Sequence, residues 1–154
     1  MKILIASDSF KGSMSSNEVA TALTQGFKEI DDTLDIIKVP VSDGGEGMIE
    51  ALVEANNGEV VKIRVKGPLG KPIDSFYGIS QNGETAYIEV AAAIGLYLVD
   101  KNERNPLNTT TFGVGELILS AVKRGCKNII VGLGGSSTND GGIGMAKALG
   151  IRFL

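Results

Sequence analysis

Histidine is absent from the 154-residue sequence, and this absence excludes several kinds of chemistry. No Ser-His-Asp triad, histidine general base or histidine metal cluster can form in this chain. Any proton transfer must therefore use Asp, Glu, Lys or Tyr side chains. The single cysteine, Cys126, excludes an internal disulfide and a zinc–thiolate cluster, and it indicates a reducing, cytoplasmic setting.

The sequence also lacks the signatures of several common protein classes. The apolar run within residues 1–10 is too short for a signal peptide or a membrane span, so we expect no membrane association. The net charge of −3 provides no basic surface for a nucleic acid, so no nucleic acid partner is expected. Neither a G-x-x-x-x-G-K-[ST] run nor a G-x-G-x-x-G run occurs, which excludes a Walker-type loop and the dinucleotide fingerprint.

Apolar residues make up 43% of the chain and charged residues 21%, a balance typical of a globular protein. We expect strands at 2–6 and 34–39 to alternate with helices at 15–30 and 46–56. This β-α-β-α opening predicts a parallel, doubly wound α/β sheet.

Local signals mark where these helices begin and end. Ser15 and Glu18 have the spacing of a capping box, and Gly58 stands where a C-terminal glycine would close the second helix. The first helix has one apolar stripe, formed by Val19, Leu23, Phe27 and Ile30.

The pattern changes near residue 60, and alternating apolar residues predict a mostly antiparallel section up to about residue 100. Turn signals at 67–72 and 81–83 separate its strands, and the second predicts a hairpin.

Alternation of helix and strand then resumes. We expect a helix at 112–124, a buried strand at 128–133 and a helix ending near Gly150. The inward residues of the first of these helices are Leu117, Ile118, Ala121 and Val122. Residues 151–154 have the pattern of the start of another strand, which indicates a truncated polypeptide.

Three loops rich in glycine and polar side chains each follow a predicted strand and precede a predicted helix. Ligands bind at the carboxyl ends of parallel strands, where helix N-termini attract anions. The loop at 7–13 offers a lysine for phosphate, and the loop at 42–47 offers the carboxylate oxygens that Mg²⁺ prefers. The loop at 132–142 offers hydroxyls and a backbone anion nest. Ordinary turns with helix caps also explain the first two loops when each is taken alone.

Five runs of sequence, in the same order, resemble motifs of the glycerate kinase family, the bacterial type that forms phosphoglycerate from ATP and glycerate. They are DSFKGS at 8–13, VSDGGEG at 41–47, GPLG at 67–70, ERNPLNTTTFGVGELI at 103–118 and GLGGSSTNDGG at 132–142. Ser7 departs from the family pattern, which usually has proline there, and this should alter loop rigidity more than chemistry.

The resemblance implies two α/β domains, a parallel, doubly wound, flavodoxin-like domain and an inserted mixed α/β domain. Family members are more than twice as long as this chain. We therefore expect residues 1–59 to form the first part of the flavodoxin-like domain and residues 60–154 the first part of the inserted domain, both incomplete.

The resemblance also implies ATP-dependent phosphorylation of glycerate, with 2-phosphoglycerate as the expected product and with ATP and Mg²⁺ as cofactors. Lys11 would neutralise the transferring phosphate or the substrate carboxylate. Asp43 or Asp140 would orient the attacking hydroxyl and accept its proton, and the other aspartate would hold Mg²⁺ together with Glu46.

The remaining candidates bind substrate or phosphate, and the backbone of residues 134–139 is expected to cradle the phosphates. Asn105, Thr109 and Thr110 are weaker substrate candidates, because local loop bonding also explains them. The full set of binding candidates is Asp8, Ser9, Gly12, Ser13, Gly44, Gly45, Gly47, Asn105, Thr109, Thr110, Gly134, Gly135, Ser136, Ser137, Thr138, Asn139, Gly141 and Gly142.

Two alternatives stay open. The chain could be an inactive fragment, or one half of a split enzyme whose partner is the missing C-terminal portion. GLGGSST also resembles the phosphate loop of the galactokinase/homoserine kinase group, although that group does not explain DSFKGS or SDGGEG.

Overall fold

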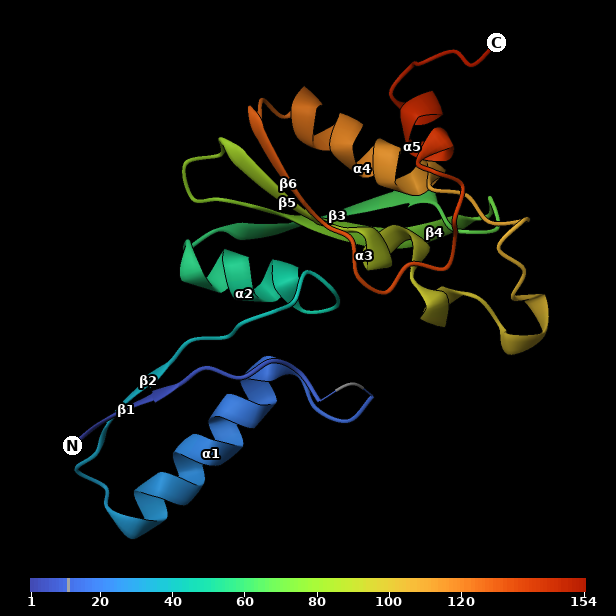
Figure 1. Cartoon of the computed structure of the whole chain (residues 1–154). Helices are drawn as coiled ribbons and strands as arrows, with labels where there is room; N and C mark the ends of the chain where they lie inside the picture. Colours follow the sequence, from blue (N-terminus) through green and yellow to red (C-terminus); the bar gives the residue numbers. More distant parts are fainter. Residues whose placement is uncertain (11) are drawn as a thin grey trace. The chain divides into compact units, whose positions relative to one another are not determined.

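The computed structural model describes residues 1–10 and 12–154, which form two compact units, Met1–Asp43 and Gly44–Leu154 (Figure 1). Lys11, the predicted phosphate-binding lysine, lies outside the described residues. Each unit is a mixture of helices and strands, as the sequence predicts.

The first unit is a β-α-β element. Strands β1 (Lys2–Ile5) and β2 (Asp35–Lys38) pair in parallel, and helix α1 (Ser16–Ile30) connects them. The predicted capping box is present: the amide of Glu18 donates to the Ser15 hydroxyl, and the amide of Ser15 donates to the Glu18 carboxylate (2.7 Å).

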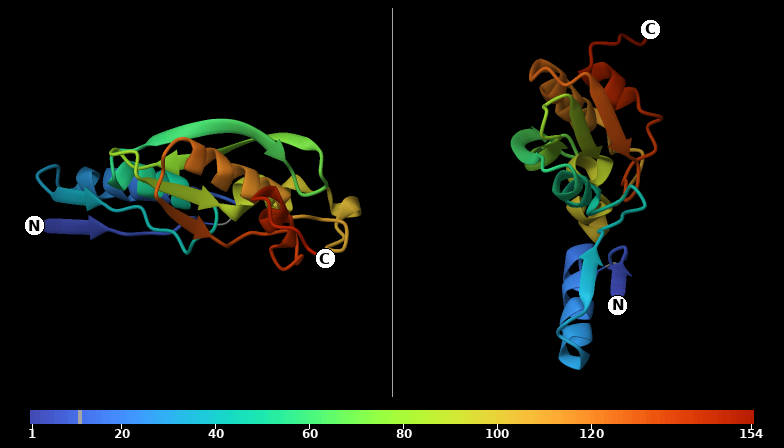
Figure 2. Two further views of the ribbon diagram at one scale, coloured as in Figure 1. Left: turned by 90° about the horizontal axis from the view of Figure 1, so that it is seen from above. Right: turned by 90° about the vertical axis from the view of Figure 1, so that its left-hand side faces the viewer.

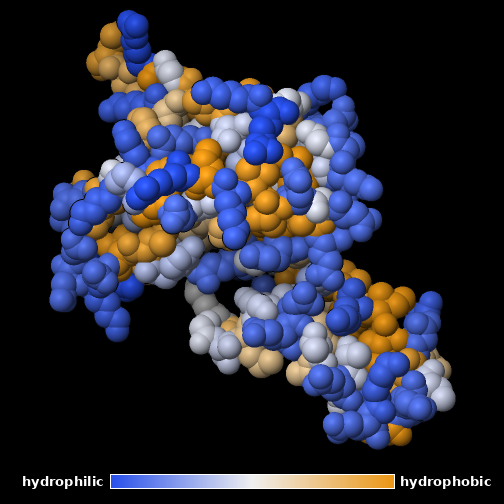
Figure 3. Space-filling model, turned by 180° about the vertical axis from the view of Figure 1, so that it is seen from behind, coloured by the Kyte–Doolittle hydropathy of each residue, from blue (hydrophilic) through white to orange (hydrophobic). Residues whose placement is uncertain are grey.

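The predicted apolar stripe of α1 is buried only near the start of the helix. Val19 is 7% exposed, whereas Leu23 is 45% and Ile30 is 85% exposed. Each strand of this unit has 4 residues and spans about 13 Å, but the 15-residue helix spans about 22 Å. The strands are therefore too short to cover the whole helix, and hydrophobic surface is visible on this unit in Figure 3.

Helix α2 (Met48–Ala55) opens the second unit, and its C-terminus differs from the prediction. Asn57, not Gly58, takes the left-handed conformation (φ 46°), and the amide of Gly58 donates to the Val53 carbonyl (2.8 Å). Gly58 has a different reason to be glycine, since a Cβ there would collide with the Ile79 carbonyl.

The second unit contains a four-stranded sheet in the order β3-β4-β5-β6. Strands β3 (Glu59–Lys66), β4 (Pro72–Ile79) and β5 (Thr85–Glu89) pair antiparallel, which confirms the predicted antiparallel section and its hairpin. Strand β6 (Asn128–Gly132) pairs in parallel with β5, so both strands end at the same edge of the sheet.

Helices cover both faces of this sheet (Figures 1 and 2). Helix α4 (Phe112–Lys123) packs on the face to which Tyr77 points, and the Tyr77 hydroxyl bonds Ser120 of this helix (3.1 Å). Helix α2 packs on the opposite face, where a Cβ on Gly78 would lie 2.6 Å from Val53. The shorter elements are α3 (Val90–Ile94), the 3₁₀ turns η1 (Leu96–Leu98) and η2 (Lys101–Glu103), and α5 (Ile143–Ala148).

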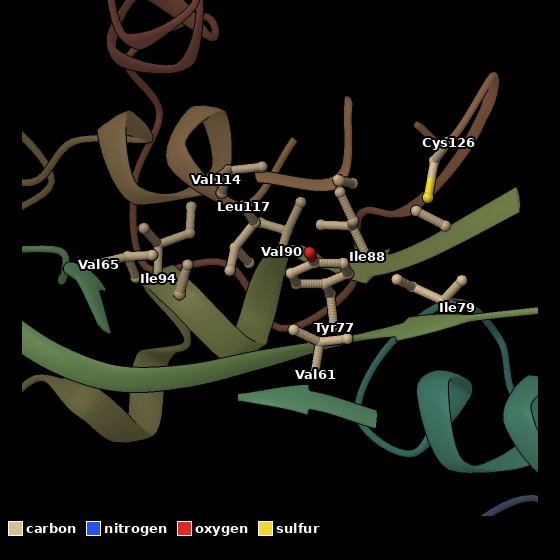
Figure 4. Close-up of a cluster of buried hydrophobic side chains, with 13 residues drawn as sticks. Val61, Val65, Tyr77, Ile79, Ile88, Val90, Ile94, Val114, Leu117 and Cys126 are labelled. Atoms are coloured by element: carbon tan, nitrogen blue, oxygen red, sulfur yellow. The ribbon is translucent and has the colours of Figure 1, made fainter. Parts of the chain in front are cut away.

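The core of the unit lies between α4 and the sheet (Figure 4). Leu117 and Val114 of α4 point toward Tyr77 and Ile88 of the strands, and all four are almost fully buried. None of the helices formed by residues 1–10 and 12–154 is long and apolar enough to cross a membrane.

Three expectations for the C-terminal part are wrong. Val122 is 51% exposed, because it lies beside the inward face defined by Leu117 and Ala121. Strand β6 is buried on one face only: Ile129 and Val131 pack against the core, whereas Ile130 points to the opposite face and is 46% exposed. Residues 151–154 form no strand.

A truncation within α4 tests the core assignment. We expect Leu117→Ala to lower the free energy of unfolding by about 2–5 kcal/mol, because it leaves a cavity in a fully buried site. Val122→Ala, in the same helix, should change it by less than about 0.5 kcal/mol. Urea unfolding followed by tyrosine fluorescence measures both, since all three tyrosines lie in this unit. Equal losses for the two variants would contradict the assignment.

Candidate functional site

Two of the predicted glycine-rich loops meet at the edge of the sheet where β5 and β6 end. The amide of Gly134 donates to the Gly44 carbonyl (3.0 Å), and a Cβ on Gly134 would lie 2.6 Å from the Cα of Gly45. A Cβ on Gly132 would likewise collide with the Gly44 carbonyl. Close packing of one loop on the other therefore explains these glycines without any ligand.

Asp140 connects the loop at 132–142 to the start of α4. Its carboxylate accepts bonds from the amide (2.9 Å) and hydroxyl (2.9 Å) of Thr111 and from the amides of Gly142 (3.0 Å) and Gly144 (3.0 Å). The hydroxyl of Thr110 lies 3.5 Å away. These donors match the roughly four acceptor sites of a carboxylate, so few remain for a metal or a proton.

Hydrogen bonding keeps Asp140 ionised. Burial alone raises the pKa of this carboxyl, but the bonds from Thr111, Gly144 and Gly142 outweigh burial, and the net pKa lies below its ordinary value. A carboxylate with a lowered pKa is a weak base. The geometry therefore favours a positioning role for Asp140, which holds the first turns of α4 and α5 together.

Threonine and serine side chains tie the same loop to the segments around it. The Thr109 hydroxyl, in a residue 6% exposed, donates to the Ser137 carbonyl (3.1 Å), and the Thr138 hydroxyl donates to the Thr109 carbonyl (3.1 Å). Both the amide and the hydroxyl of Ser137 donate to the Ile94 carbonyl (2.9 and 2.8 Å). These bonds fix the loop against the end of α3.

A cavity of about 300 Å³ lies where these segments meet. Its lining includes six of the predicted binding residues, namely Asn105, Thr109, Ser136, Ser137, Thr138 and Asn139. Leu96, Val99, Pro106 and Arg104 complete the lining. Two sequence motifs that lie about thirty residues apart in the chain therefore contribute to one small polar cavity.

Hydrogen bonds within the chain already use part of two predicted binding groups, the Asn105 side chain and the backbone amides of residues 134–139. The Asn105 side-chain oxygen accepts from the Leu107 amide (3.0 Å), a typical turn within the loop. In the predicted phosphate cradle, the amides of Gly134, Ser137 and Thr138 all donate to other groups of the chain. The amides of Gly135, Ser136 and Asn139 make no bond to any residue that the structure describes.

Glu89 is a buried acid at this edge that was not predicted from the sequence. It ends β5, is 3% exposed, and accepts a bond from the Ile49 amide (2.8 Å) at the start of α2. The N-cap residue of helix α2 is Gly47, which has no side chain to accept a hydrogen bond from the first turn. The Glu89 carboxylate, at the end of a strand, accepts the bond from the Ile49 amide instead. The only feature of the sequence that could have pointed to Glu89 is its position as a single glutamate at the end of an apolar strand.

Five of the remaining predicted residues, Asp8, Ser9, Gly12, Ser13 and Asp43, lie in the first unit, whereas Glu46, Gly47 and Gly141 lie in the second. The amide of Ser9 donates to the Asp8 carboxylate (2.6 Å), and the amide of Ser13 donates to the Phe10 carbonyl (2.8 Å). Gly12 has a φ of 75°, and Asp43 is exposed at the end of this unit.

The donors present suit Mg²⁺ only in part. Within residues 1–10 and 12–154, no group of three acidic, cysteine or histidine side chains is placed to hold a metal ion. Bound Mg²⁺ takes one or two carboxylates and completes its coordination with phosphates and water. The exposed Glu46, which lies near Gly135, fits that limited role better than Asp140, whose oxygens accept protein donors.

Comparison with known proteins identifies the family of this chain. The model of the glycerate kinase family matches residues 3–154. The chain belongs to the glycerate kinase family. The five sequence runs that resemble this family therefore reflect true membership.

Relatives of the chain are considerably longer than the chain itself. A glycerate kinase from Bacillus subtilis (strain 168) is 53% identical over 154 residues, which is 100% of this chain but 40% of the relative. A glycerate 2-kinase from Escherichia coli (strain K12) is 53% identical over 99% of this chain and 40% of its own length. A crystal structure of a protein assigned as glycerate kinase 2 from Salmonella typhimurium LT2 aligns with a TM-score of 0.85 and 54% identity, covering 97% of this chain and 41% of that chain. The chain thus spans about 40% of the length of these family members.

Glu89 makes the stability of this family member depend on pH. Burial, opposed by the amide of Ile49 and reinforced by the charge of Glu50, raises the pKa of Glu89 from 4.5 to about 7. The neutral form is favoured in the folded state, so its stabilising effect is complete below pH 4.5 and is lost as the pH rises through 7. We expect the wild type to lose on the order of 3 kcal/mol relative to Glu89→Gln between pH 5 and pH 8.

Tyrosine-detected urea unfolding at several pH values measures this difference. Glu59→Gln, which removes an exposed carboxylate of the same unit, is the matched control and should follow the wild type. A carbon NMR titration of the Glu89 carboxyl gives its pKa directly. A pH-independent difference between wild type and Glu89→Gln would show that the burial argument is wrong.

Proposed function

We propose that this chain takes part in the ATP-dependent phosphorylation of glycerate, with 2-phosphoglycerate as the product. The observation that carries the proposal is the cavity in which Asn105 and Thr109 face residues 136–139. Relatives named glycerate kinase and glycerate 2-kinase support the substrate and the product.

The proposed division of roles follows the chemistry of the groups. Phosphoryl transfer depends on positioning and on neutralising charge. The amides of Gly135, Ser136 and Asn139 would bind phosphate oxygens of ATP, and Lys11 would neutralise the transferring group. Asp43, rather than the hydrogen-bonded Asp140, would accept the proton of the attacking hydroxyl.

Mg²⁺ would be held by Glu46 together with phosphate oxygens, and it would reduce the negative charge of the nucleotide. Asp140 would act indirectly, by keeping Thr111 and the loop at 132–142 in place. The absence of histidine agrees with a mechanism in which aspartate and lysine do the acid–base and electrostatic work. A cytoplasmic setting, where ATP is available, is part of the same proposal.

Release of ADP in the presence of glycerate tests this function on the 154-residue chain itself. We expect ADP release with glycerate to exceed that with homoserine, galactose or no acceptor, and phosphorus NMR to identify 2-phosphoglycerate. A folded chain that releases no ADP with glycerate would contradict the proposal and favour the inactive-fragment alternative. Preference for homoserine or galactose would favour the other kinase group.

Two variants separate the roles of the aspartates. Asp43→Asn should lower kcat by about 10²- to 10⁴-fold, because it removes the proposed base. Asp140→Asn should act mainly through stability, since it removes an acceptor of several hydrogen bonds. The exposed Asp32→Asn is the control and should turn over at the wild-type rate. If Asp43→Asn turns over within a few-fold of wild type, the assignment of Asp43 as the base is wrong.

A further inference from the structure

Arg104 is the single charged side chain that the described part of the chain contributes to the lining of the cavity. Its neighbours in the lining are of two kinds. Leu96, Val99 and Pro106 form an apolar side, while Thr109 and Asn139 contribute polar groups. A ligand that matches this lining needs a short carbon skeleton, polar substituents and negative charge.

The backbone holds the Arg104 guanidinium in place and leaves part of it available. Its Nε donates to the Val99 carbonyl (3.2 Å), and one terminal nitrogen donates to the Leu96 carbonyl (3.4 Å). A guanidinium has five N–H donors, so these two bonds leave three for a ligand. Because these two bonds orient the exposed Arg104 side chain, a bound anion would meet a partly preorganised donor set.

The charge of Arg104 is not neutralised by a neighbour. Asp100 and Glu103 are close in sequence, but no carboxylate of residues 1–10 or 12–154 forms an ion pair with Arg104. Among the residues that the structure describes, the lining contains no acidic side chain. The cavity therefore presents a net positive charge to a ligand.

The size of the cavity limits the ligand. A volume of about 300 Å³ lies at the small end of the range of about 300–1,000 Å³ that is usual for ligand pockets. A three-carbon acid fits within such a space, and it is several times smaller than an adenine nucleotide. The apolar side formed by Leu96 and Val99 also suits carbon atoms better than inorganic phosphate.

We infer that the cavity binds the carboxylate of a short hydroxy acid and that Arg104 is the residue that selects the acid over the corresponding uncharged polyol. The identity of the acid as glycerate rests on the proposed function. The inference assigns the acceptor to the cavity between residues 104–109 and 136–139. The adenosine part of the nucleotide would lie outside this cavity, and only its terminal phosphate would reach the amides of Ser136 and Asn139.

Calorimetric titration of the wild-type chain with four ligands tests the ligand class without any substitution. We expect glycerate to bind at least about tenfold more tightly than glycerol, which has an uncharged hydroxymethyl group in place of the carboxylate. Inorganic phosphate should compete weakly with glycerate, and ATP should not displace it. Equal affinity for glycerol, no glycerate binding, or displacement of glycerate by phosphate at equal concentration would each overturn the inference.

Substitution of Arg104 tests the residue. Arg104→Met should weaken glycerate binding at least about tenfold, leave glycerol binding unchanged, and leave ATP binding within twofold of wild type. Arg104→Lys keeps the charge and should bind glycerate more tightly than Arg104→Met does. Such a recovery would show that the loss in Arg104→Met comes from the missing charge and not from loss of folding. Arg124→Met, an exposed arginine at the end of α4, is the matched control for the change in charge.

Binding and catalysis give separate answers. Folded Arg104→Met that binds glycerate within twofold of wild type would overturn the inference, even if the chain releases ADP with glycerate. Conversely, Arg104-dependent glycerate binding in a chain that releases no ADP would support the inference while the proposed function fails. In an active chain, the KM for glycerate should rise in Arg104→Met, whereas the KM for ATP should not.

Discussion

The candidate site depends on one backbone contact, in which the loop after β6 lies directly on the loop before α2. Gly134 donates to the Gly44 carbonyl, and any side chain at Gly134 would collide with Gly45. Glu89 reinforces this arrangement from the end of β5 by capping the first turn of α2. Strand ends, helix start and loop are thereby fixed to one another, and the cavity that we assign to the acceptor forms beside them.

Most polar side chains near the cavity form hydrogen bonds that stabilise the fold, in addition to their proposed role in binding ligands. Asp140, Thr109 and Ser137 all bond to other segments of the second unit. Preorganisation of this kind lets the few remaining donors act without reorganising when a ligand binds. Arg104 follows the same rule, because two backbone carbonyls orient its guanidinium and leave the rest of the group for an anion.

Local signals predicted much of the fold, and long-range packing decided the rest. The capping box at Ser15 and the hairpin at residues 81–83 depend on neighbours in the chain, so the sequence was sufficient for them. The role of Gly58 depends on Ile79, and the exposure of Ile130 depends on which face of β6 packs against the core. For the site, glycine and hydroxyl content located the cavity loops, but Glu89 and Arg104 act through residues or surfaces that sequence spacing does not reveal.

Amide hydrogen exchange in wild type and Gly134→Ala tests most directly whether the loop contact holds the site. The Leu96 and Ser137 amides donate to the Gly135 and Ile94 carbonyls, so their exchange rates report the position of the loop. We predict that both amides are protected in the wild type and lose protection in Gly134→Ala, while amides within α4 keep theirs. Unchanged protection of Leu96 and Ser137 in the variant would contradict the account.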